Sequence, residues 1–395
     1  MKKHTANRLI LVSKYLFWLS FFFLISCNKS KEKEKEELEQ NEPLAALPLE
    51  IPTPLDNPLT KEKAELGKLL FFDPILSGNK DVACATCHHP EYGFAENLDL
   101  SIGVNGHGLS SKRAFTTTNN IPFVKRNSQT IVNVAFNGFS YQHGYDASKA
   151  PMFWDMRAES LEKQAIEPIK TLEEMRGPKI SEDKILEKVV SRIKGNLQYK
   201  KLFQDAFQDS VTLENLAKAL ASYQRTIIAN NSRFDKYMRG DLTALSYNEI
   251  VGLKAFEKAG CTNCHNGPMF SDFKTHTIGV VDNDKLNCID DGINKTHSFR
   301  TPTLRNLRIT HPYMHNGKIK TLTNVLEFYE DLSGGIIANQ TLKPNQLDPL
   351  VKKLKVDFKD ISSILEFLGT LNDESYDKSI PKMVPSGLQV GGNLK

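Results

Sequence analysis

Apolar residues recur at the three- and four-residue spacing of an amphipathic helix in several parts of the chain. Four segments present such a face: Ile185, Leu186, Val189, Val190 and Ile193; Leu213, Leu216, Ala217, Leu220, Tyr223 and Ile227; Leu322, Val325, Leu326 and Tyr329; and Ile361, Ile364, Leu365 and Leu368. Few alternating runs are long enough to form a strand. The pattern predicts a mostly α fold with long loops over residues 90–155 and 266–320.

Chain length sets the number of domains to expect. With 395 residues, the chain is long enough for about two domains, each with its own core. We place the boundary near residue 235. The expected domains are residues 59–235 and 236–375, followed by a tail over residues 376–395.

The amino-terminal segment has the layout of a secretory signal. In residues 1–26, a basic stretch precedes Tyr15–Ile25, an uncharged run of eleven residues that is too short for a comfortable membrane span. The run ends in Leu24-Ile25-Ser26-Cys27, which resembles the lipobox of bacterial lipoproteins and makes Cys27 the expected lipid-bearing residue. The alternative is a simple uncleaved anchor. Both interpretations place the rest of the chain outside the cytoplasm and at a membrane.

A change of composition follows the leader. Residues 29–37 are nearly all Lys and Glu, and prolines then recur at short intervals up to Pro58. Because proline interrupts helices and strands, we predict a tether over residues 27–58. A charged surface helix over residues 29–39 is the alternative.

Net charge argues against nucleic-acid binding. The chain has 51 basic and 47 acidic residues, and its first 26 residues hold four of the bases and none of the acids. The remainder therefore has 51 − 4 = 47 bases against 47 acids. A neutral body lacks the overall basic charge that favours binding to a phosphate backbone.

Four of the six cysteines form two copies of one pattern. The copies are Cys84-Ala-Thr-Cys87-His88 and Cys261-Thr-Asn-Cys264-His265. This C-x-x-C-H spacing is typical of c-type haem attachment, because two thiols on one helical turn can each add to a haem vinyl group and the adjacent histidine then lies under the iron. The sequence therefore predicts two covalently bound haems.

Two other uses of paired cysteines agree less well with this pattern. Zinc sites place their C-x-x-C pairs about 15–20 residues apart, whereas these pairs begin 261 − 84 = 177 residues apart. A thioredoxin-like redox pair does not need a histidine at the same place twice. Cys288 has no partner in this scheme and receives no role beyond a free thiol.

Several further motifs resemble those of the bacterial dihaem cytochrome c peroxidases and their MauG-like relatives. They occupy residues 69–77 (Leu-Leu-Phe-Phe-Asp-Pro-Ile-Leu-Ser), 153–155 (Phe-Trp-Asp), 161–165 (Leu-Glu-Lys-Gln-Ala), 174–175 (Glu-Met), 301–306 (Thr-Pro-Thr-Leu-Arg-Asn) and 312–317 (Pro-Tyr-Met-His-Asn-Gly). The match runs in the same order over about residues 60–370. The resemblance implies two cytochrome c-like haem lobes joined by functional loops.

In that family the first haem reacts with peroxide and the second relays electrons. The resemblance makes His88 the proximal ligand of the catalytic haem and His265 that of the electron-transfer haem. It makes Glu174 the catalytic carboxylate, with Gln164 beside it. A carboxylate can take a proton from one peroxide oxygen and return it to the departing one. From the residues alone, Glu174 could equally be a surface carboxylate.

Trp154 matches a residue that the family places between the two haems, where its π system could assist electron transfer. The alternative is an ordinary core aromatic. The local motif departs from the family pattern because Met156 stands where glycine is usual before Arg157. Arg157 could still pair with a haem propionate.

The first haem of the typical peroxidase is closed by a histidine that follows Ser-Ile-Gly. Here Ser101-Ile102-Gly103 is followed by Val104, which cannot bind iron. His107 could substitute as a distal ligand or could be an ordinary loop histidine. We expect an open first haem that needs no reductive activation.

The second haem departs from the peroxidase pattern as well. Tyr329 stands where typical peroxidases have a methionine ligand, and tyrosine at this place resembles MauG. A phenolate ligand would lower the potential of that haem. Tyr329 could instead be a core residue, and Met314 and His276 are weaker candidates for the ligand.

The resemblance also implies a calcium ion between the lobes. Asn127, Thr310 and Pro312 stand where family members bind Ca²⁺ through an amide oxygen and two backbone carbonyls. Gln129 replaces a proline that is common in the family, a small departure.

Three functions follow as hypotheses. The first is a peroxidase that reduces hydrogen peroxide to water with electrons from a small cytochrome c or a cupredoxin. The second is a MauG-like oxidase that modifies Trp or Tyr of a partner protein, and the third is a non-enzymatic carrier with both haems closed. We expect membrane contact through the lipid anchor only and no nucleic-acid partner, and the pattern allows a homodimer.

Overall fold

The computed structural model describes residues 42–116, 118–146 and 150–394. The predicted signal peptide and Cys27 lie outside these residues. Within them, no helix is long and apolar enough to cross a membrane.

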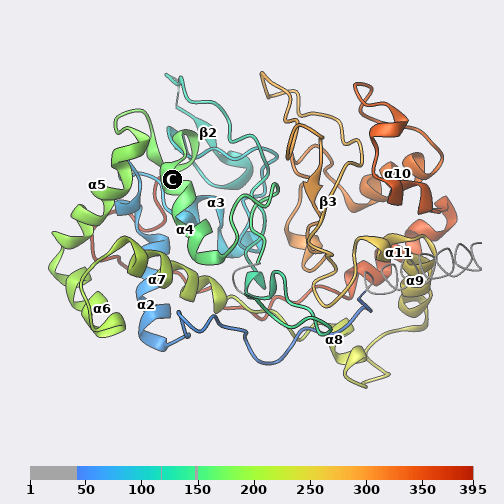
Figure 1. Ribbon diagram of the computed structural model, residues 1–395, viewed down its shortest axis with the longest axis horizontal. Coiled ribbons are helices and arrows are strands. Elements are labelled where there is room, and N and C mark those ends of the chain that lie inside the picture. The colour runs from blue at the N-terminus through green and yellow to red at the C-terminus, as the bar shows by residue number, and fades with distance from the viewer. Residues whose placement is uncertain (1–41, 117, 147–149, 395) are drawn as a thin grey trace, which may run out of the picture. The chain divides into compact units, whose positions relative to one another are not determined.

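The five longer helices that surround a first hydrophobic core in the described part of the chain are grouped on the left of Figure 1. They are α2 (Lys61–Phe72), α4 (Leu161–Lys170), α5 (Glu182–Lys194), α6 (Leu197–Phe207) and α7 (Leu213–Arg225). The apolar faces predicted on α5 and α7 are buried, with Ile185 and Leu220 both fully inaccessible to solvent. These two helix predictions are confirmed.

A second core lies among three further helices, on the right of Figure 1. They are α9 (Tyr247–Lys258), α10 (Leu322–Ser333) and α11 (Ile361–Gly369). Four phenylalanine rings pack edge-on or tilted at its centre: Phe234, Phe256, Phe270 and Phe367. The predicted faces on α10 and α11 thus belong to one core.

The two cores share one device of helix packing. In α2, a Cβ atom on Gly67 would lie 2.0 Å from the backbone oxygen of Ala219 in α7. In α9, a Cβ atom on Gly252 would lie 1.9 Å from the backbone oxygen of Ser363 in α11. Both distances are far below van der Waals contact, so each helix pair crosses at this separation only because the residue is glycine.

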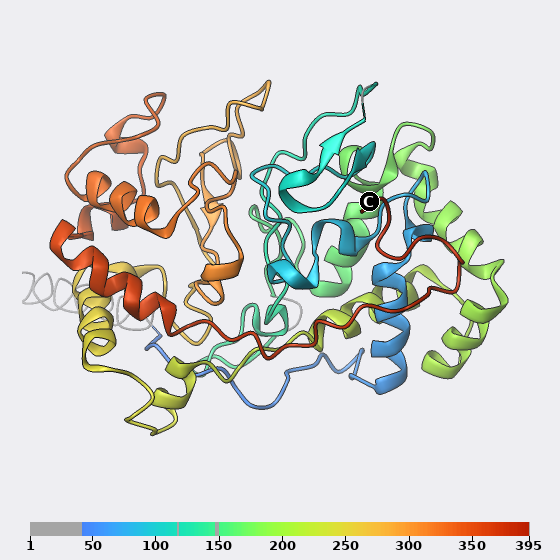
Figure 2. The same cartoon turned by 180° about the vertical axis from the view of Figure 1, so that it is seen from behind.

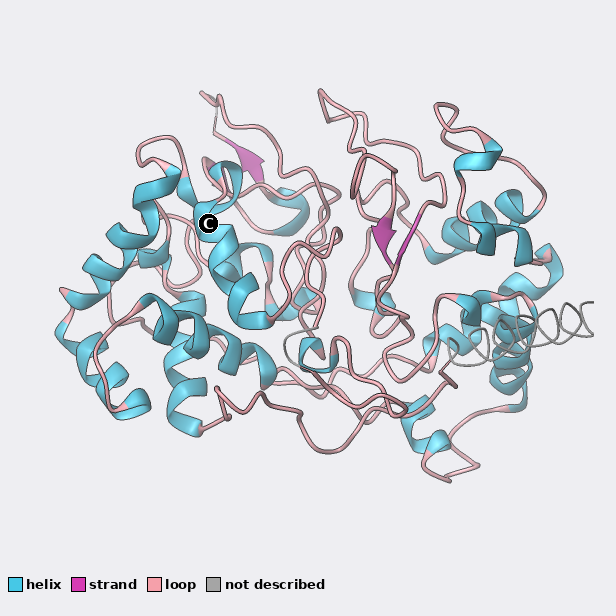
Figure 3. Ribbon diagram, viewed as in Figure 1, coloured by secondary structure: helices cyan, strands magenta, loops and turns pink. Residues whose placement is uncertain are grey.

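The long loops contain only short elements, as Figure 3 shows. Two antiparallel pairs of two-residue strands occur among the described residues: β1 (Gly106–His107) with β2 (Ala114–Phe115), and β3 (Thr275–His276) with β4 (Phe299–Arg300). The short helices are α3 (Cys84–Cys87) and α8 (Arg233–Met238). The 3₁₀ turns are η1 (Pro74–Leu76), η2 (Pro90–Tyr92), η3 (Ser110–Lys112), η4 (Val134–Phe136), η7 (Cys261–Asn263), η8 (Leu307–Ile309), η9 (Pro344–Gln346), η10 (Pro349–Lys353) and η11 (Phe358–Asp360), and η6 (Leu172–Arg176) is a π turn. This content is compatible with the predicted mostly α class.

Residues 44–58 differ from the tether that we predicted over residues 27–58. Leu47 is 1% exposed, and its amide donates a hydrogen bond of 2.9 Å to Oδ1 of Asp235. Asp235 is in turn paired with Arg305 at 3.0 Å. The segment has no helix or strand, but Leu47 is buried and Leu44 packs against the second core, and burial of their apolar surface stabilises this packing, whereas Leu49 and Leu55 are exposed. This part of the predicted tether is therefore packed against the cores.

Residues 376–394, the described part of the predicted tail over residues 376–395, pack against the first core. Tyr376 and Val384 are buried there, and the amide of Gly391 donates to the carbonyl of Phe72 at 2.8 Å. The hydroxyl of Thr86 donates to the carbonyl of Gly391 at 2.8 Å. In Figure 2 this red segment runs from α11 back to α2. We call residues 376–394 the strap.

Candidate functional site

The first C-x-x-C-H motif presents its histidine ready to bind a metal. Cys84 and Cys87 lie at the two ends of α3, and His88 follows directly. The ring atom Nδ1 of His88 lies 2.9 Å from the carbonyl oxygen of Phe94. A carbonyl can only accept, so Nδ1 carries the proton and Nε2 keeps its lone pair. Burial lowers the pKa of His88, which further favours the neutral ring.

The second motif repeats this arrangement. Nδ1 of His265 lies 2.9 Å from the carbonyl oxygen of Phe270, and burial lowers the pKa of His265 as well. No disulfide joins the cysteines of the described residues, so all four motif thiols are free to form thioethers. Both motifs therefore have the thiols and the oriented imidazole that a c-type haem requires.

The first cavity is lined by Cys84, Cys87 and His88 together with the predicted catalytic pair, Gln164 and Glu174. Gln164 comes from α4, and Glu174 comes from the π turn η6 that follows it. Burial raises the pKa of Glu174 to about 7. A carboxyl group with this pKa can both accept and release a proton near neutral pH.

Two backbone hydrogen bonds hold the turn that carries Glu174. The amide of Val104 donates to the carbonyl of Glu173 at 3.0 Å, and the amide of Gly78 donates to the carbonyl of Met175 at 2.8 Å. Val104 is fully buried against this turn. His107 is exposed on β1 and does not line the first cavity. Val104, which follows the Ser101-Ile102-Gly103 motif, thus supports the turn that carries Glu174.

The second cavity is lined by Cys261, Cys264, His265 and Tyr329, and also by Met314. Burial raises the pKa of Tyr329, because an apolar site disfavours the phenolate. The structure thus brings Tyr329, the predicted distal ligand, to the same cavity as His265, the predicted proximal ligand.

One wall belongs to both cavities. The residues that line both are Asn127, Ser128, Gln129, Thr130, Val134, Asn137, Trp154 and Arg300. Trp154 is 8% exposed, and its Nε1 donates to the carbonyl of Asn127 at 3.0 Å. The indole thus lies in the wall that the two cavities share.

Comparison with known proteins identifies the family. A family model described as di-haem cytochrome c peroxidase matches residues 61–243. The methylamine utilization protein MauG of Methylophilus methylotrophus is 32% identical over 343 residues, which cover 85% of this chain and 90% of that protein. The chain belongs to the di-haem cytochrome c peroxidase and MauG family.

Two further matches are a protein named as a peroxidase and a solved structure. The cytochrome c551 peroxidase of Nitrosomonas europaea is 31% identical, over 88% of this chain and 89% of that protein. A crystal structure of a MauG-like protein associated with microbial copper homeostasis has a TM-score of 0.66 and 26% identity, over 83% of this chain and 95% of that one. Membership of the di-haem family implies two c-type haems, which agrees with the two motifs.

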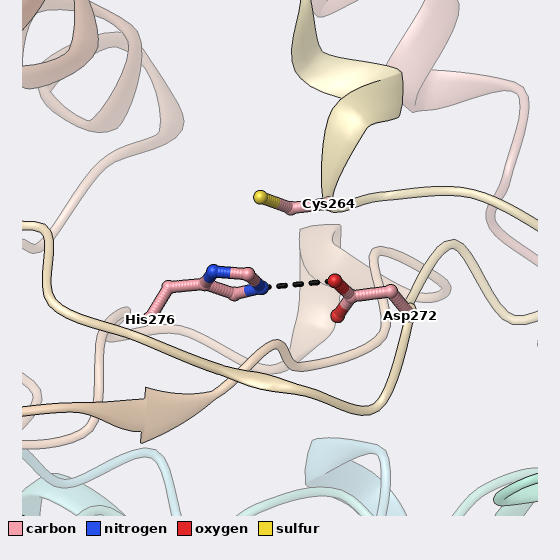
Figure 4. A group of neighbouring side chains, drawn as sticks. All are labelled: Cys264, Asp272 and His276. Atoms are coloured by element: carbon pink, nitrogen blue, oxygen red, sulfur yellow. Dashed lines mark hydrogen bonds and ion pairs between the residues drawn. The ribbon is translucent and has the colours of Figure 1, made fainter. Parts of the chain in front are cut away.

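A carboxylate–histidine cluster lies beside the second motif, as Figure 4 shows. Nε2 of His276 lies 2.9 Å from Asp272, and Nδ1 lies 2.8 Å from Asp348. Burial alone would lower the pKa of His276, but the hydrogen bonds to these two carboxylates raise it to about 12. Both ring nitrogens are therefore protonated and bonded, which differs from the free lone pair that an iron ligand needs. The third member, Cys264, belongs to the haem motif.

The residues predicted to bind calcium line a common cavity. Asn127, Thr310 and Pro312 all line the second cavity. Nδ2 of Asn127 donates to the carbonyl of Leu98 at 2.7 Å, so the amide oxygen is the side-chain atom that a cation could use. Among the described residues, the one group of three or more His, Cys, Asp or Glu suited to a metal is elsewhere, at Cys264.

Sequence reasoning missed two buried charged residues near the cavities. Burial raises the pKa of Glu96 to about 7, and its nearest cation is Arg113, at 3.7 Å. Arg300 is buried in the wall between the cavities. It directly precedes the Thr301–Asn306 motif, but a lone arginine in a loop has no periodicity that could reveal its burial.

Proposed function

We propose that this chain is a cytochrome c peroxidase that reduces hydrogen peroxide to two waters, using two electrons and two protons. The observation that carries the proposal is the place of Glu174, a half-buried carboxyl group that lines the same cavity as His88 and Gln164, where desolvation raises its pKa to about 7. Relatives named cytochrome c peroxidases at about 31% identity support it.

A haem held by Cys84, Cys87 and His88 would supply an iron that binds peroxide and accepts its oxidising equivalents. The chain's own residues manage the protons. Glu174 takes the proton from one peroxide oxygen and returns it to the departing oxygen, so that water leaves rather than hydroxide. Gln164 orients the peroxide through its amide without competing for the proton, because an amide does not titrate in this range.

The second haem, held by Cys261, Cys264 and His265, would pass electrons to the first. Trp154 in the shared wall provides the aromatic path, and Tyr329 is the proposed distal ligand. The electrons come from a small cytochrome c or cupredoxin. We place the chain at the periplasmic side of a membrane, anchored by lipid on Cys27, with one Ca²⁺ near Asn127, Thr310 and Pro312.

The test is the variant Glu174→Gln, which keeps the shape of the side chain and removes its proton transfer. We expect kcat with peroxide to fall by about 10²- to 10⁴-fold, while the protein still carries two haems by pyridine haemochrome assay. Glu187→Gln on the exposed face of α5 is the matched control and should retain wild-type turnover. Wild-type turnover in Glu174→Gln would contradict the proposal.

A MauG-like oxidation of a partner protein is the second candidate. The observation that favours it is Tyr329 in the second cavity, since a phenolate ligand stabilises oxidised iron more than a thioether does. Rapid steady turnover with a reduced cytochrome supports the peroxidase. Peroxide-dependent modification of a partner's Trp or Tyr, with slow turnover of the cytochrome, would favour the oxidase. A carrier with both haems closed would need neither Gln164 nor Glu174.

A further inference from the structure

Arg300 has an unusual position in the wall between the two cavities. It lies on β4, is 6% exposed, and is the only charged residue among those that line both cavities. Its backbone amide donates to the carbonyl of Trp154 at 2.7 Å, which holds the two residues next to each other. A positive charge is thus held at the one place that both cavities share.

The hydrogen bonds of the Arg300 guanidinium go to neutral groups. Nε donates to the carbonyl of Phe153 at 2.9 Å, and one terminal nitrogen donates to Oε1 of Gln129 at 3.1 Å. The other terminal nitrogen has a long contact of 3.5 Å with the carbonyl of Thr301. None of these oxygens carries a negative charge.

The other buried arginines each lie near a carboxylate, so Arg300, which bonds only to neutral groups, is an exception. Arg305 pairs with Asp235 at 3.0 Å, Arg225 pairs with Glu162, and Arg113 lies 3.7 Å from Glu96. Among the buried arginines of the described residues, Arg300 alone has no ion pair with a carboxylate. Burial lowers the pKa of Arg300 to about 10, so the side chain is still a cation at neutral pH.

A buried charge without a counter-ion is costly, because desolvation is not offset by attraction. A negatively charged group bound from outside the chain would lower this cost. Two neighbouring arginines are less suited to bind a negatively charged group shared by both cavities. Arg126 is already paired with both Asp155 and Asp290. Arg157 is 42% exposed and lines only the first cavity.

We propose that Arg300 is the common counter-charge of the two haems, neutralising propionate carboxylates at the wall between the cavities and raising the reduction potential of both. The inference rests on the proposed function for the presence of a haem in each cavity. It concerns the potentials and not the reaction with peroxide. Positive charge near a haem favours the reduced iron, which carries one positive charge fewer.

The test is spectroelectrochemical titration of three variants of the full-length holoprotein. Arg300→Gln removes the charge, Arg300→Lys keeps the charge with a different head group, and Arg308→Gln removes the same charge from an exposed site that lines neither cavity. We expect Arg300→Gln to lower both reduction potentials, with both Arg300→Lys and Arg308→Gln remaining close to wild type.

Several outcomes would overturn the inference. They are a fall in only one potential of Arg300→Gln, a fall in neither, or an equal fall in Arg308→Gln. If the glutamine variant does not accumulate with two haems, Arg300→Lys decides: retained potentials support the inference, and two lowered potentials overturn it. Failure of the proposed function is seen separately, as a wild-type protein that lacks two haems or does not turn over peroxide.

Discussion

The two C-x-x-C-H sites are alike around the motif histidine and differ in the other residues that line their cavities. In each, a histidine Nδ1 lies 2.9 Å from the carbonyl oxygen of a phenylalanine. In each, a glycine lets two helices of the surrounding core cross closely. The first cavity then receives Gln164 and Glu174, whereas the second receives Tyr329. The haem-attachment motif and its histidine contact are thus repeated. The two cavities differ in the segments that carry Gln164 and Glu174 in the first and Tyr329 in the second.

The strongest way to break this comparison is to remove one attachment site at a time. Cys84→Ser combined with Cys87→Ser should reduce the haem content from two to one and abolish turnover with peroxide. The corresponding pair, Cys261→Ser with Cys264→Ser, should also leave one haem but should keep binding of peroxide at the first site. Pyridine haemochrome assays and stopped-flow absorbance distinguish the two. Binding of peroxide by the first double variant would contradict the assignment.

The pH dependence of turnover sharpens the comparison at the first site. Burial raises the pKa of Glu174 to about 7, and proton acceptance needs the ionised carboxylate. We therefore expect kcat/KM for peroxide to rise with pH up to about 7 and to level off above it. Below the pKa, each pH unit should reduce kcat/KM by about tenfold. An acid limb near the ordinary carboxyl value of 4.5, or one unchanged in Glu174→Gln, would contradict this.

The smallest expected effect concerns the feature that both cores share. Gly67→Ala and Gly252→Ala should each lower the free energy of unfolding by about 1–3 kcal/mol, because the added methyl group meets backbone that cannot move away. Gly369→Ala in α11 has open space around its Cβ position and should not destabilise. Denaturant titration of the holoproteins measures all three. Equal stability of Gly252→Ala and Gly369→Ala would show that the close crossing is not needed.

The spacing of apolar residues and the motifs predicted the main helices and the site residues, but not which distant segments pack together. The apolar faces of α5, α7, α10 and α11 repeat every three or four residues, so the sequence alone indicates them. The resemblance to the family predicted Gln164, Glu174 and Trp154 as site residues from the order of the motifs. The structure places all three in the lining of the cavities. The strap and residues 44–58 could not be predicted, because their burial depends on surfaces formed by residues far away in the chain. Arg300 was missed for a related reason: its significance is the absence of an acidic neighbour in space.

The strap has a consequence for the order in which the molecule is completed. Thr86, between the two cysteines of the first motif, donates its hydroxyl hydrogen bond to the carbonyl of Gly391, which lies beyond the second motif in the chain. A ribosome therefore translates the whole second site before it reaches the residue that closes over the first. The site that appears earlier in the nascent polypeptide is thus the later one to be finished.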